Sequence, residues 1–271
     1  MNELSLFTGA GGGLLGTTIL GWRHVGYVEK ENYCQKIIIQ RIKDGIFDDA
    51  PIFGDIRTFI SEGYAAEYQG LVDIITAGFP CQPFSVAGKQ KGGNDARNMW
   101  PETIQCLRII RPRFALLENV PGLLAHRYIQ RIFGDLAESG YNARWCVLGA
   151  DDVGAQHRRK RLWILADTES TKCERSRNTW SRGDGFTVSG NVSDSPCVGM
   201  EGNRTGGEQK SDTHERPELS MRRTVNGWPI EPDVGRVAHG VASRVDRLKA
   251  IGNGQVPRVV ATAWKILSKD L

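Results

Sequence analysis

The fold of this chain is decided near its amino terminus by residues 3–13, which read Glu3-Leu4-Ser5-Leu6-Phe7-Thr8-Gly9-Ala10-Gly11-Gly12-Gly13. Residues 3–7 predict a short strand, and apolar pairs at 14–15 and 19–20 then recur at helical spacing. A strand, a glycine turn and a helix in this order open a nucleotide-binding α/β unit, because glycines let the backbone approach a ligand and the helix N-terminus offers free amides. A flexible turn explains the glycines equally well, so this motif alone is a weak signal.

The second predicted strand covers residues 24–28 and ends at Glu29, about 20 positions beyond the glycines. An acidic residue in this position holds ribose hydroxyls in nucleotide-binding folds. A solvated surface glutamate is the alternative interpretation. A helix is expected over 33–43, followed by a loop that contains Asp55 and Ile56.

A cysteine stands in a proline-rich stretch, Phe79-Pro80-Cys81-Gln82-Pro83-Phe84-Ser85, directly after an apolar run at 71–77. That run predicts a buried strand, so Cys81 is expected at the carboxyl edge of the sheet, where open α/β folds bind ligands. The prolines fix φ and predict a stiff loop. A small buried hydrophobe in a tight turn is the alternative, but the rest of the chain favours a functional thiol.

The middle of the chain continues the α/β alternation. A glycine-rich polar segment at 88–97 is expected to be a mobile loop able to close over a substrate, with an ordinary surface loop as the alternative. A helix is predicted at 102–110, a strand at 114–119, a helix at 123–139, and strands at 143–148 and 162–165. Glu118 lies at the end of the 114–119 strand, where a carboxylate is costly to bury unless it serves a site or is paired.

A basic cluster at 157–161 precedes the last of these strands. Alternation along an extended chain would place His157, Arg159 and Arg161 on one face, suited to a phosphate or a base. A solvated surface is the alternative. At the other end of the chain, residues 252–257 are expected to form a turn and residues 259–267 an amphipathic helix.

Composition indicates a globular protein of 271 residues, with a net charge of +4. No apolar run is long enough for a membrane span, and no signal peptide is apparent. The six cysteines are scattered and lack a Cys-x-x-Cys pair, which fits a reducing, cytoplasmic setting. A metal site assembled from Cys173, Cys197 and His214 lacks ligand spacing, so we expect no metal.

Residues 167–235 differ in amino-acid composition from the rest of the chain. They carry nine Lys/Arg and twelve Asp/Glu, which leaves a net charge of +7 on the remaining residues. Only 14 of these 69 residues are apolar, against 40% for the whole chain. We expect a small, loop-rich recognition segment or a partly disordered one, attached to a basic body suited to a polyanion.

The ordered set of motifs resembles the DNA (cytosine-5)-methyltransferases of bacteria and phages, over residues 4–165 and 236–267. Residues 7–12 resemble the cofactor loop of that family, and Pro80-Cys81-Gln82 its nucleophile motif. Glu118-Asn119-Val120 resembles its acidic motif, residues 157–161 its Gln-x-Arg-x-Arg motif, and residues 252–257 its C-terminal cofactor motif.

The resemblance implies an α/β fold with a Rossmann-like S-adenosylmethionine-dependent methyltransferase sheet and a small, loop-rich target-recognition region. It divides the chain into a catalytic, cofactor-binding domain at 1–166, a target-recognition region at 167–235 and a segment at 236–271 that returns to the catalytic domain. The implied cofactor is S-adenosyl-L-methionine, and the implied partner is double-stranded DNA. The residues that it implies for cofactor binding are Phe7, Gly9, Gly11, Gly12, Glu29, Asp55, Ile56, Pro80 and Asn253.

The implied reaction is methyl transfer to C5 of a cytosine that has been flipped out of the duplex. Cys81 would add to C6 of the ring, and Glu118 would bind N3 and the exocyclic amine. Arg159 and Arg161 would hold the base from its other edge. Three positions depart from the family pattern: Ser5 replaces an aspartate, Lys30 an aromatic residue, and His157 a glutamine.

Other interpretations remain open at this point. The same fold and chemistry would serve an RNA cytosine-5 methyltransferase, and a non-catalytic DNA-binding protein could retain the fold. A nicotinamide oxidoreductase would explain the glycine loop and Glu29 but not Pro80-Cys81-Gln82. We expect a cytoplasmic monomer without membrane contacts. The sequence leaves open whether the protein acts alone or beside a cognate restriction endonuclease at the same DNA site.

Overall fold

A computed structural model describes residues 1–80, 98–168, 244–269 and 271. The chain divides into two compact units, Met1–Asn178 with Val245–Leu271, and Thr179–Arg244. Apart from Arg244, the second unit lies outside the described residues, as do Cys81, the loop expected at 88–97, and the three residues considered for a metal site. The architecture given below is therefore that of the first unit.

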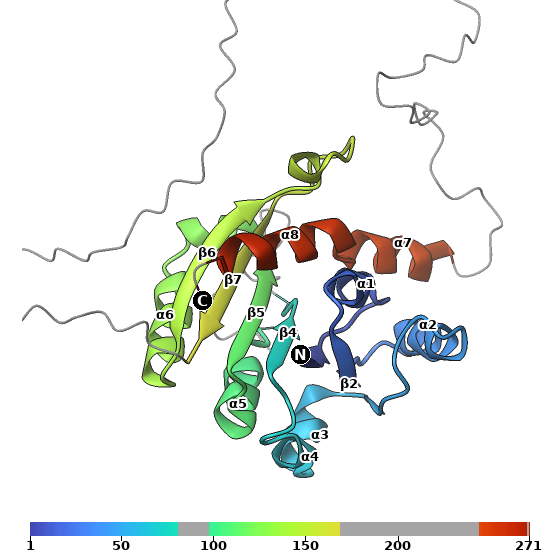
Figure 1. The fold of residues 1–271 in the computed structure, drawn as a ribbon, viewed down its shortest axis with the longest axis horizontal. Helices are drawn as coiled ribbons and strands as arrows, with labels where there is room; N and C mark the ends of the chain where they lie inside the picture. The colour runs from blue at the N-terminus through green and yellow to red at the C-terminus, as the bar shows by residue number, and fades with distance from the viewer. Residues whose placement is uncertain (81–97, 169–243, 270) are drawn as a thin grey trace, which may run out of the picture. The chain divides into compact units, whose positions relative to one another are not determined.

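The first unit is built on a seven-stranded sheet with the order β3-β2-β1-β4-β5-β7-β6 (Figure 1). The strands are β1 (Asn2–Leu6), β2 (Arg23–Val28), β3 (Ile52–Phe53), β4 (Ile74–Ala77), β5 (Phe114–Asn119), β6 (Asn142–Leu148) and β7 (Arg161–Asp167). The first five strands are parallel to one another, whereas β7 runs antiparallel to both β5 and β6. The order reverses between β1 and β4, which creates a topological switch point at their carboxyl ends.

Helices cover both faces of this sheet. They are α1 (Gly12–Ile19), α2 (Asn32–Lys43), α3 (Ile56–Ser61), α4 (Tyr64–Glu67), α5 (Trp100–Ile110), α6 (Tyr128–Glu138), α7 (Arg244–Asn253) and α8 (Pro257–Leu267), with short 3-10 helices η3 (Pro121–Ala125) and η4 (Asp151–Val153). The α/β class predicted from the sequence is confirmed. No helix among the described residues is long and apolar enough to cross a membrane.

The two-residue period of the strands divides the core into layers. In β5, Ala115 and Leu117 belong to the apolar cluster that contains residues of α3, α4, α5 and α6. Phe114 and Leu116 belong instead to the cluster that contains residues of α8. Because neighbouring side chains of a strand point to opposite faces, one continuous apolar strand serves both layers, as a buried parallel strand does.

The last helix, α8, is held on the sheet by apolar side chains and by a close approach to α1. A Cβ placed on Gly16 of α1 would lie 2.6 Å from both the Pro257 carbonyl oxygen and the Val260 Cβ. Trp264 stacks edge-on against Trp22 at 4.9 Å and against Phe114 at 5.3 Å between ring centroids. Residues from the far end of the chain thus complete the core layer that contains side chains of β4, β5, β6 and β7 (Figure 1).

Three expected boundaries are wrong in detail. The strand expected at 71–77 begins only at Ile74, since Leu71 lies in a turn with 59% of its surface exposed. The helix expected at 123–139 is interrupted at His126, whose extended backbone separates η3 from α6. The turn expected at 252–257 is shorter, because α7 continues through Asn253 and only residues 254–256 link it to α8.

Candidate active site

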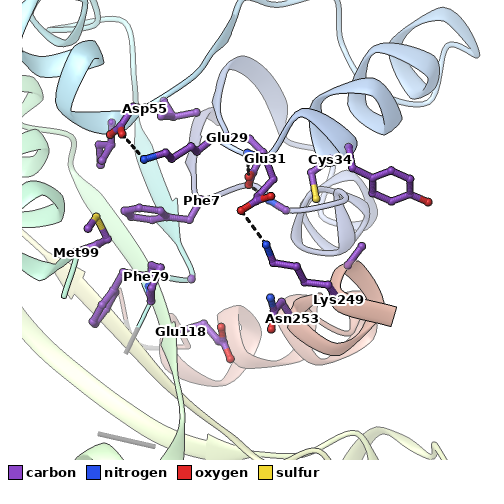
Figure 2. Close-up of a pocket in the computed structure, with 18 of the residues that line it drawn as sticks. Phe7, Glu29, Glu31, Cys34, Asp55, Phe79, Met99, Glu118, Lys249 and Asn253 are labelled. Atoms are coloured by element: carbon purple, nitrogen blue, oxygen red, sulfur yellow. Dashed lines mark hydrogen bonds and ion pairs between the residues drawn. The ribbon is translucent and has the colours of Figure 1, made fainter. Parts of the chain in front are cut away.

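A cavity of about 750 Å³ opens at the carboxyl edge of the sheet, at the switch point between β1 and β4 (Figure 2). Its walls come from the residues that follow β1, β2 and β4, from the end of β5, and from α7. Of the site residues expected from the sequence, it is lined by Phe7, Gly9, Glu29, Asp55, Ile56, Pro80, Glu118, Arg161 and Asn253. Elements distant in sequence therefore bring most of the expected residues into one place.

Glu29 lies at one end of the cavity with both carboxylate oxygens occupied by backbone donors. The Gly9 amide donates to Glu29 Oε2 at 2.6 Å, and the Glu31 amide donates to Glu29 Oε1 at 2.7 Å. Burial raises the pKa of Glu29, and these two hydrogen bonds oppose the increase. Each oxygen keeps a further lone pair, so the side chain remains able to accept from a ligand hydroxyl.

The backbone of the first loop is tightly constrained where it meets the cavity. Phe7 has φ of 53° and Gly9 has φ of 60°, both in the left-handed region. This region is costly for an aromatic residue, and such conformations persist where the surroundings enforce them, often at functional sites. Open space surrounds the position where a Gly9 side chain would begin.

Gly11 and Gly12 lie outside the lining of the cavity and are required for packing instead. A Cβ on Gly11 would lie 2.7 Å from the Phe47 ring, and Gly11 has φ of 86°. The same atom on Gly12 would clash with the carbonyl oxygen of Gln255. These two glycines therefore allow the first loop to pack against other parts of the chain.

Asp55 lies near Glu29 with its side chain already engaged (Figure 2). Its Oδ1 accepts from the Arg57 amide at 2.9 Å and caps α3, while Lys30 Nζ donates to its Oδ2 at 2.8 Å. The bond from Lys30 is the main reason that the pKa of Asp55 is lowered. Lys30 thus reaches across this end of the cavity. It stands where the family pattern has an aromatic residue. A second ion pair, Lys249 with Glu31 at 2.8 Å, joins α7 to the segment after β2.

Glu118 lies at the other end of the cavity (Figure 2). Only 12% of its side chain is exposed, and Arg161 Nε lies 2.9 Å from its Oε1. Gln255 Nε2 donates to its Oε2 at 3.4 Å. Burial raises the pKa of Glu118, and Arg161, Gln255 and Arg159 oppose the increase in that order.

The antiparallel strand β7 explains how Arg161 reaches Glu118. Glu118 is the penultimate residue of β5, and it pairs with Trp163 near the start of β7. A parallel strand in this place would bring its carboxyl end to the cavity, whereas β7 brings its first residue, Arg161. The ion pair is therefore a direct result of the strand direction.

The other basic residues of the 157–161 cluster are arranged differently from the expectation. The strand begins only at Arg161, so alternation does not extend to His157, which is exposed. Arg159 has φ of 30°, and its guanidinium donates to the Gly254 carbonyl oxygen in the link between α7 and α8. Arg159 and Arg161 thus act on Glu118 from one side, and His157 is not part of the group.

A hydrogen bond from the last residue of β5 fixes the backbone just before the expected nucleophile, Cys81. Asn119 Nδ2 donates to the Phe79 carbonyl oxygen at 3.2 Å, and Phe79 packs against Trp100 with 5.3 Å between ring centroids. Pro80 lines the cavity and is the last described residue before Cys81. Asn253, the last residue of α7, lines it from the opposite part of the chain.

Three residues of the site, Asn119, Gln255 and Lys249, were not expected from the sequence. The ion pair of Lys30 with Asp55 was not expected either. Asn119 and Gln255 lie inside quoted motifs, so their positions could have been noted from the sequence. The contacts of Lys249 and Lys30 carry no local signal, because they depend on which segments the fold brings together. Among the described residues, no cluster of three or more His, Cys, Asp or Glu is placed to hold a metal ion.

An open α/β sheet with a cavity at the switch point and an arginine-paired carboxyl in its wall defines a protein that binds a ligand at the carboxyl edge. The family description "C-5 cytosine-specific DNA methylase" matches residues 1–229, and the chain belongs to this family. The family expected from the motifs is therefore confirmed.

Individual relatives match about three fifths of the chain. Type II methyltransferase M.NgoMIV of Neisseria gonorrhoeae is 36% identical over 168 residues, which are 60% of this chain and 51% of that protein. Type II methyltransferase M.NaeI of Lentzea aerocolonigenes is 33% identical over 169 residues, covering 61% of this chain and 40% of the relative. The chain thus spans about half the length, or less, of these curated relatives.

Similar solved structures include a putative DNA modification methyltransferase encoded within an E. coli prophage, with 24% identity and a TM-score of 0.48. It matches 62% of this chain and 46% of its own. The Dnmt2 methyltransferase of S. pombe has 21% identity and a TM-score of 0.49, and matches 62% of this chain and 50% of its own.

Proposed function

We propose that this protein transfers a methyl group to C5 of a flipped-out cytosine in duplex DNA, through a covalent bond between Cys81 and C6. The observation that carries the proposal is the Glu118–Arg161 pair in the wall of a cavity that Pro80 also lines. Cys81 follows Pro80 in the sequence, so the acid, the cation and the expected nucleophile motif belong to one site.

The residues of the cavity suit S-adenosylmethionine, which would supply the methyl group. Glu29 presents a carboxylate able to accept from the ribose hydroxyls. Phe7 and Ile56 offer apolar surface, while the Gly9 backbone adjoins open space. Asp55, Pro80 and Asn253 complete the proposed binding set, and Gly11 and Gly12 shape the loop that contributes Gly9.

The chemistry requires a nucleophile because C5 of cytosine is weakly reactive. In the proposed reaction the Cys81 thiolate forms a bond to C6, and the electron pair of the C5–C6 double bond moves to C5. C5 would then accept the methyl group as the bond between that group and the donor sulfur breaks, which leaves S-adenosylhomocysteine, and a base would remove the C5 proton. The electrons of that C–H bond then restore the double bond and expel the Cys81 thiolate.

Glu118 would neutralise the ring while the thiolate adds. It would donate a proton or hydrogen bond to N3, and burial, which raises its pKa, favours the protonated form required for this. Arg161 favours the ionised form and fixes the orientation of the carboxyl group. The balance of these two effects makes Glu118 suited to giving and recovering a proton.

We further propose that residues 1–166 and 236–271 form the catalytic domain and that residues 167–235 recognise the DNA target. Support comes from the packing of α8 in the core of the sheet and from the polar composition of the intervening residues. A stacked base cannot reach the cavity, so the target cytosine would be flipped out. Cytoplasmic location, a monomeric state and a companion restriction endonuclease stay predictions.

Trapping on DNA tests the proposed function. A long duplex of mixed sequence that contains 5-fluorocytosine should form a stable covalent adduct with the wild type in the presence of S-adenosylmethionine, because fluorine blocks the final elimination. Cys81→Ala should form none, and Glu118→Gln should bind cofactor but lose most adduct formation. An adduct in Cys81→Ala would refute the assignment of the nucleophile.

The same assay separates the alternatives. Adduct formation on tRNA that contains 5-fluorocytosine, but not on duplex DNA, would favour an RNA methyltransferase. Specific DNA binding without any adduct would favour a non-catalytic DNA-binding protein. Bisulfite sequencing of DNA from cells that express the protein would then give the recognised site.

A further inference from the structure

Gln255 lies beside three glycines from two separate parts of the chain, Gly12 and Gly13 at the start of α1 and Gly78 after β4. A Cβ on Gly13, in α1, would lie 2.5 Å from Gln255 Oε1, and a Cβ on Gly78, after β4, would lie 2.9 Å from Gln255 Nε2. A Cβ on Gly12 would collide with the Gln255 carbonyl oxygen. At Gly12 the contact is with backbone, which cannot easily yield, whereas a Cβ on Gly13 or Gly78 would force the end of the Gln255 side chain to move from its present position.

The amide of Gln255 is also directed at the catalytic carboxyl. Its Nε2 donates to Glu118 Oε2 at 3.4 Å, while Arg161 engages Oε1 at 2.9 Å. The two oxygens of Glu118 are thus held by two different donors, one charged and one neutral. A carboxyl group held at both oxygens cannot rotate about its last bond without losing a partner.

The link that carries Gln255 is itself fixed. Arg159 donates to the carbonyl oxygen of the preceding residue, Gly254. Val256 follows in an extended conformation, and Pro257 begins α8, whose apolar side chains are buried against the sheet. Gln255 therefore projects from a constrained backbone and is not a freely moving surface side chain.

We propose that Gln255 is a positioning residue for Glu118, and that it links the orientation of this carboxyl group to the glycine loop at the start of α1. This proposal builds on the proposed function, in which Glu118 acts on the cytosine ring. The neutral N–H group of Gln255 stabilises the ionised carboxylate of Glu118. Loss of this donor therefore shifts Glu118 toward its protonated form. Among the described residues, the charged groups that act on Glu118 beside the neutral Gln255 amide are Arg161 and Arg159.

The proposal can be tested without turnover, by carbon-13 NMR titration of the Glu118 carboxyl carbon, assigned with Glu118→Gln. Gln255→Leu keeps the approximate shape but removes the donor, so the pKa of Glu118 should increase. Gln255→Glu places a second carboxyl beside it and should increase that pKa further. Gln40→Leu, which alters an exposed glutamine of α2 bonded to Asp44, is the matched control and should leave the Glu118 titration unchanged.

Adduct formation provides the second measurement. For Gln255→Leu, the rate on 5-fluorocytosine DNA should fall about tenfold at neutral pH, because the carboxyl group loses a partner that fixes its orientation, and this loss outweighs the gain in protonated Glu118. The pH dependence of the rate should shift with the Glu118 titration, while affinity for S-adenosylhomocysteine changes less than the rate does.

The outcomes separate this proposal from the proposed function. An active wild type with an unaltered Glu118 titration in both Gln255 variants would overturn the role of Gln255 alone, even if their stability were reduced. If the wild type formed no adduct, the proposed function would be overturned. The link between Gln255 and Glu118 would still stand if the pKa of Glu118 increased from the wild type to Gln255→Leu and further to Gln255→Glu.

Discussion

Glu3 and His24 form a buried polar pair at the amino-terminal end of the sheet, away from the cavity lining. His24 Nε2 lies 3.5 Å from Glu3 Oε2 and 3.2 Å from Thr17 Oγ1, and Thr76 Oγ1 donates to Glu3 Oε1 at 2.5 Å. Asp48 approaches the other ring nitrogen of His24 at 3.4 Å. Burial raises the pKa of Glu3 to about 7 and lowers that of His24, so both groups favour their neutral forms.

This pair predicts a pH-dependent difference in stability between the wild type and Glu3→Gln. The folded protein holds the Glu3 proton more tightly than the unfolded chain does, so this contribution is complete below the ordinary glutamate pKa of 4.5 and is lost as pH rises through the folded-state pKa of about 7. From pH 4.5 to pH 8, the wild type should lose up to about 3 kcal/mol of unfolding free energy relative to Glu3→Gln. Urea denaturation at several pH values checks this, and a constant difference would contradict it.

At the residue scale, sequence analysis predicted residue types better than their contacts. Glu118 and Arg161 were predicted separately, and the structure brings them to 2.9 Å. Arg159 was expected to hold the base, but its guanidinium binds the Gly254 carbonyl oxygen here. Gly12 was expected to serve the cofactor, yet its missing side chain makes room for Gln255. Such contacts join positions far apart in the sequence, so no local pattern specifies them.

At the scale of elements, the contact between α1 and α8 depends on one small residue. Gly16→Ala would place a methyl group 2.6 Å from the Pro257 carbonyl oxygen and the Val260 Cβ. We expect it to destabilise the protein by about 1–3 kcal/mol, the usual cost of overpacking a core. Gly134→Ala is the matched control, because Gly134 is an exposed residue of α6 with open space beside it.

Gly134→Ala should be neutral or stabilise the protein by roughly 0.5–1 kcal/mol, since alanine is the better helix former. Urea denaturation of both variants measures the difference. If the two variants had equal stability, the close approach of α1 and α8 would not hold in solution.

Element types followed from apolar periodicity, but boundaries did not. The run at 71–77 is apolar because several of its residues are buried, yet burial alone does not require extended backbone, and β4 starts at Ile74. The pattern at 123–139 is helical in period on both sides of His126, although the backbone there is extended. The antiparallel direction of β7, which delivers Arg161 to Glu118, also lacks any signal within the strand itself.

At the scale of the whole molecule, the carboxyl-terminal residues complete both the core and the cavity. Val259, Val260 and Leu267 of α8 are buried, while Lys249 and Asn253 of α7 line the cavity. Buried side chains of this size contribute roughly 1.5–3 kcal/mol each, so α8 contributes on the order of 5 kcal/mol, comparable to the stability of a typical domain.

A chain that ends at residue 243 should therefore unfold without cooperativity or aggregate, and should lose affinity for S-adenosylhomocysteine. A chain that ends at residue 269 keeps all of α8 and serves as the control. We expect it to show the same unfolding transition and the same affinity for S-adenosylhomocysteine as the full chain. Calorimetry on the three proteins makes the comparison. Intact cooperative unfolding and binding in the shorter chain would contradict the assignment of these helices to the catalytic unit.

The glycines around Gln255 have an evolutionary consequence. Because Gly12, Gly13 and Gly78 each leave room for the same side chain or its backbone, substitutions at these positions are not independent of one another. A lineage that replaces Gln255 with a small residue relaxes the constraint on Gly13 and Gly78, whereas Gly12, which meets the backbone, stays constrained. An alignment of homologues should therefore show residues 13, 78 and 255 covarying in size, with residue 12 invariant as glycine.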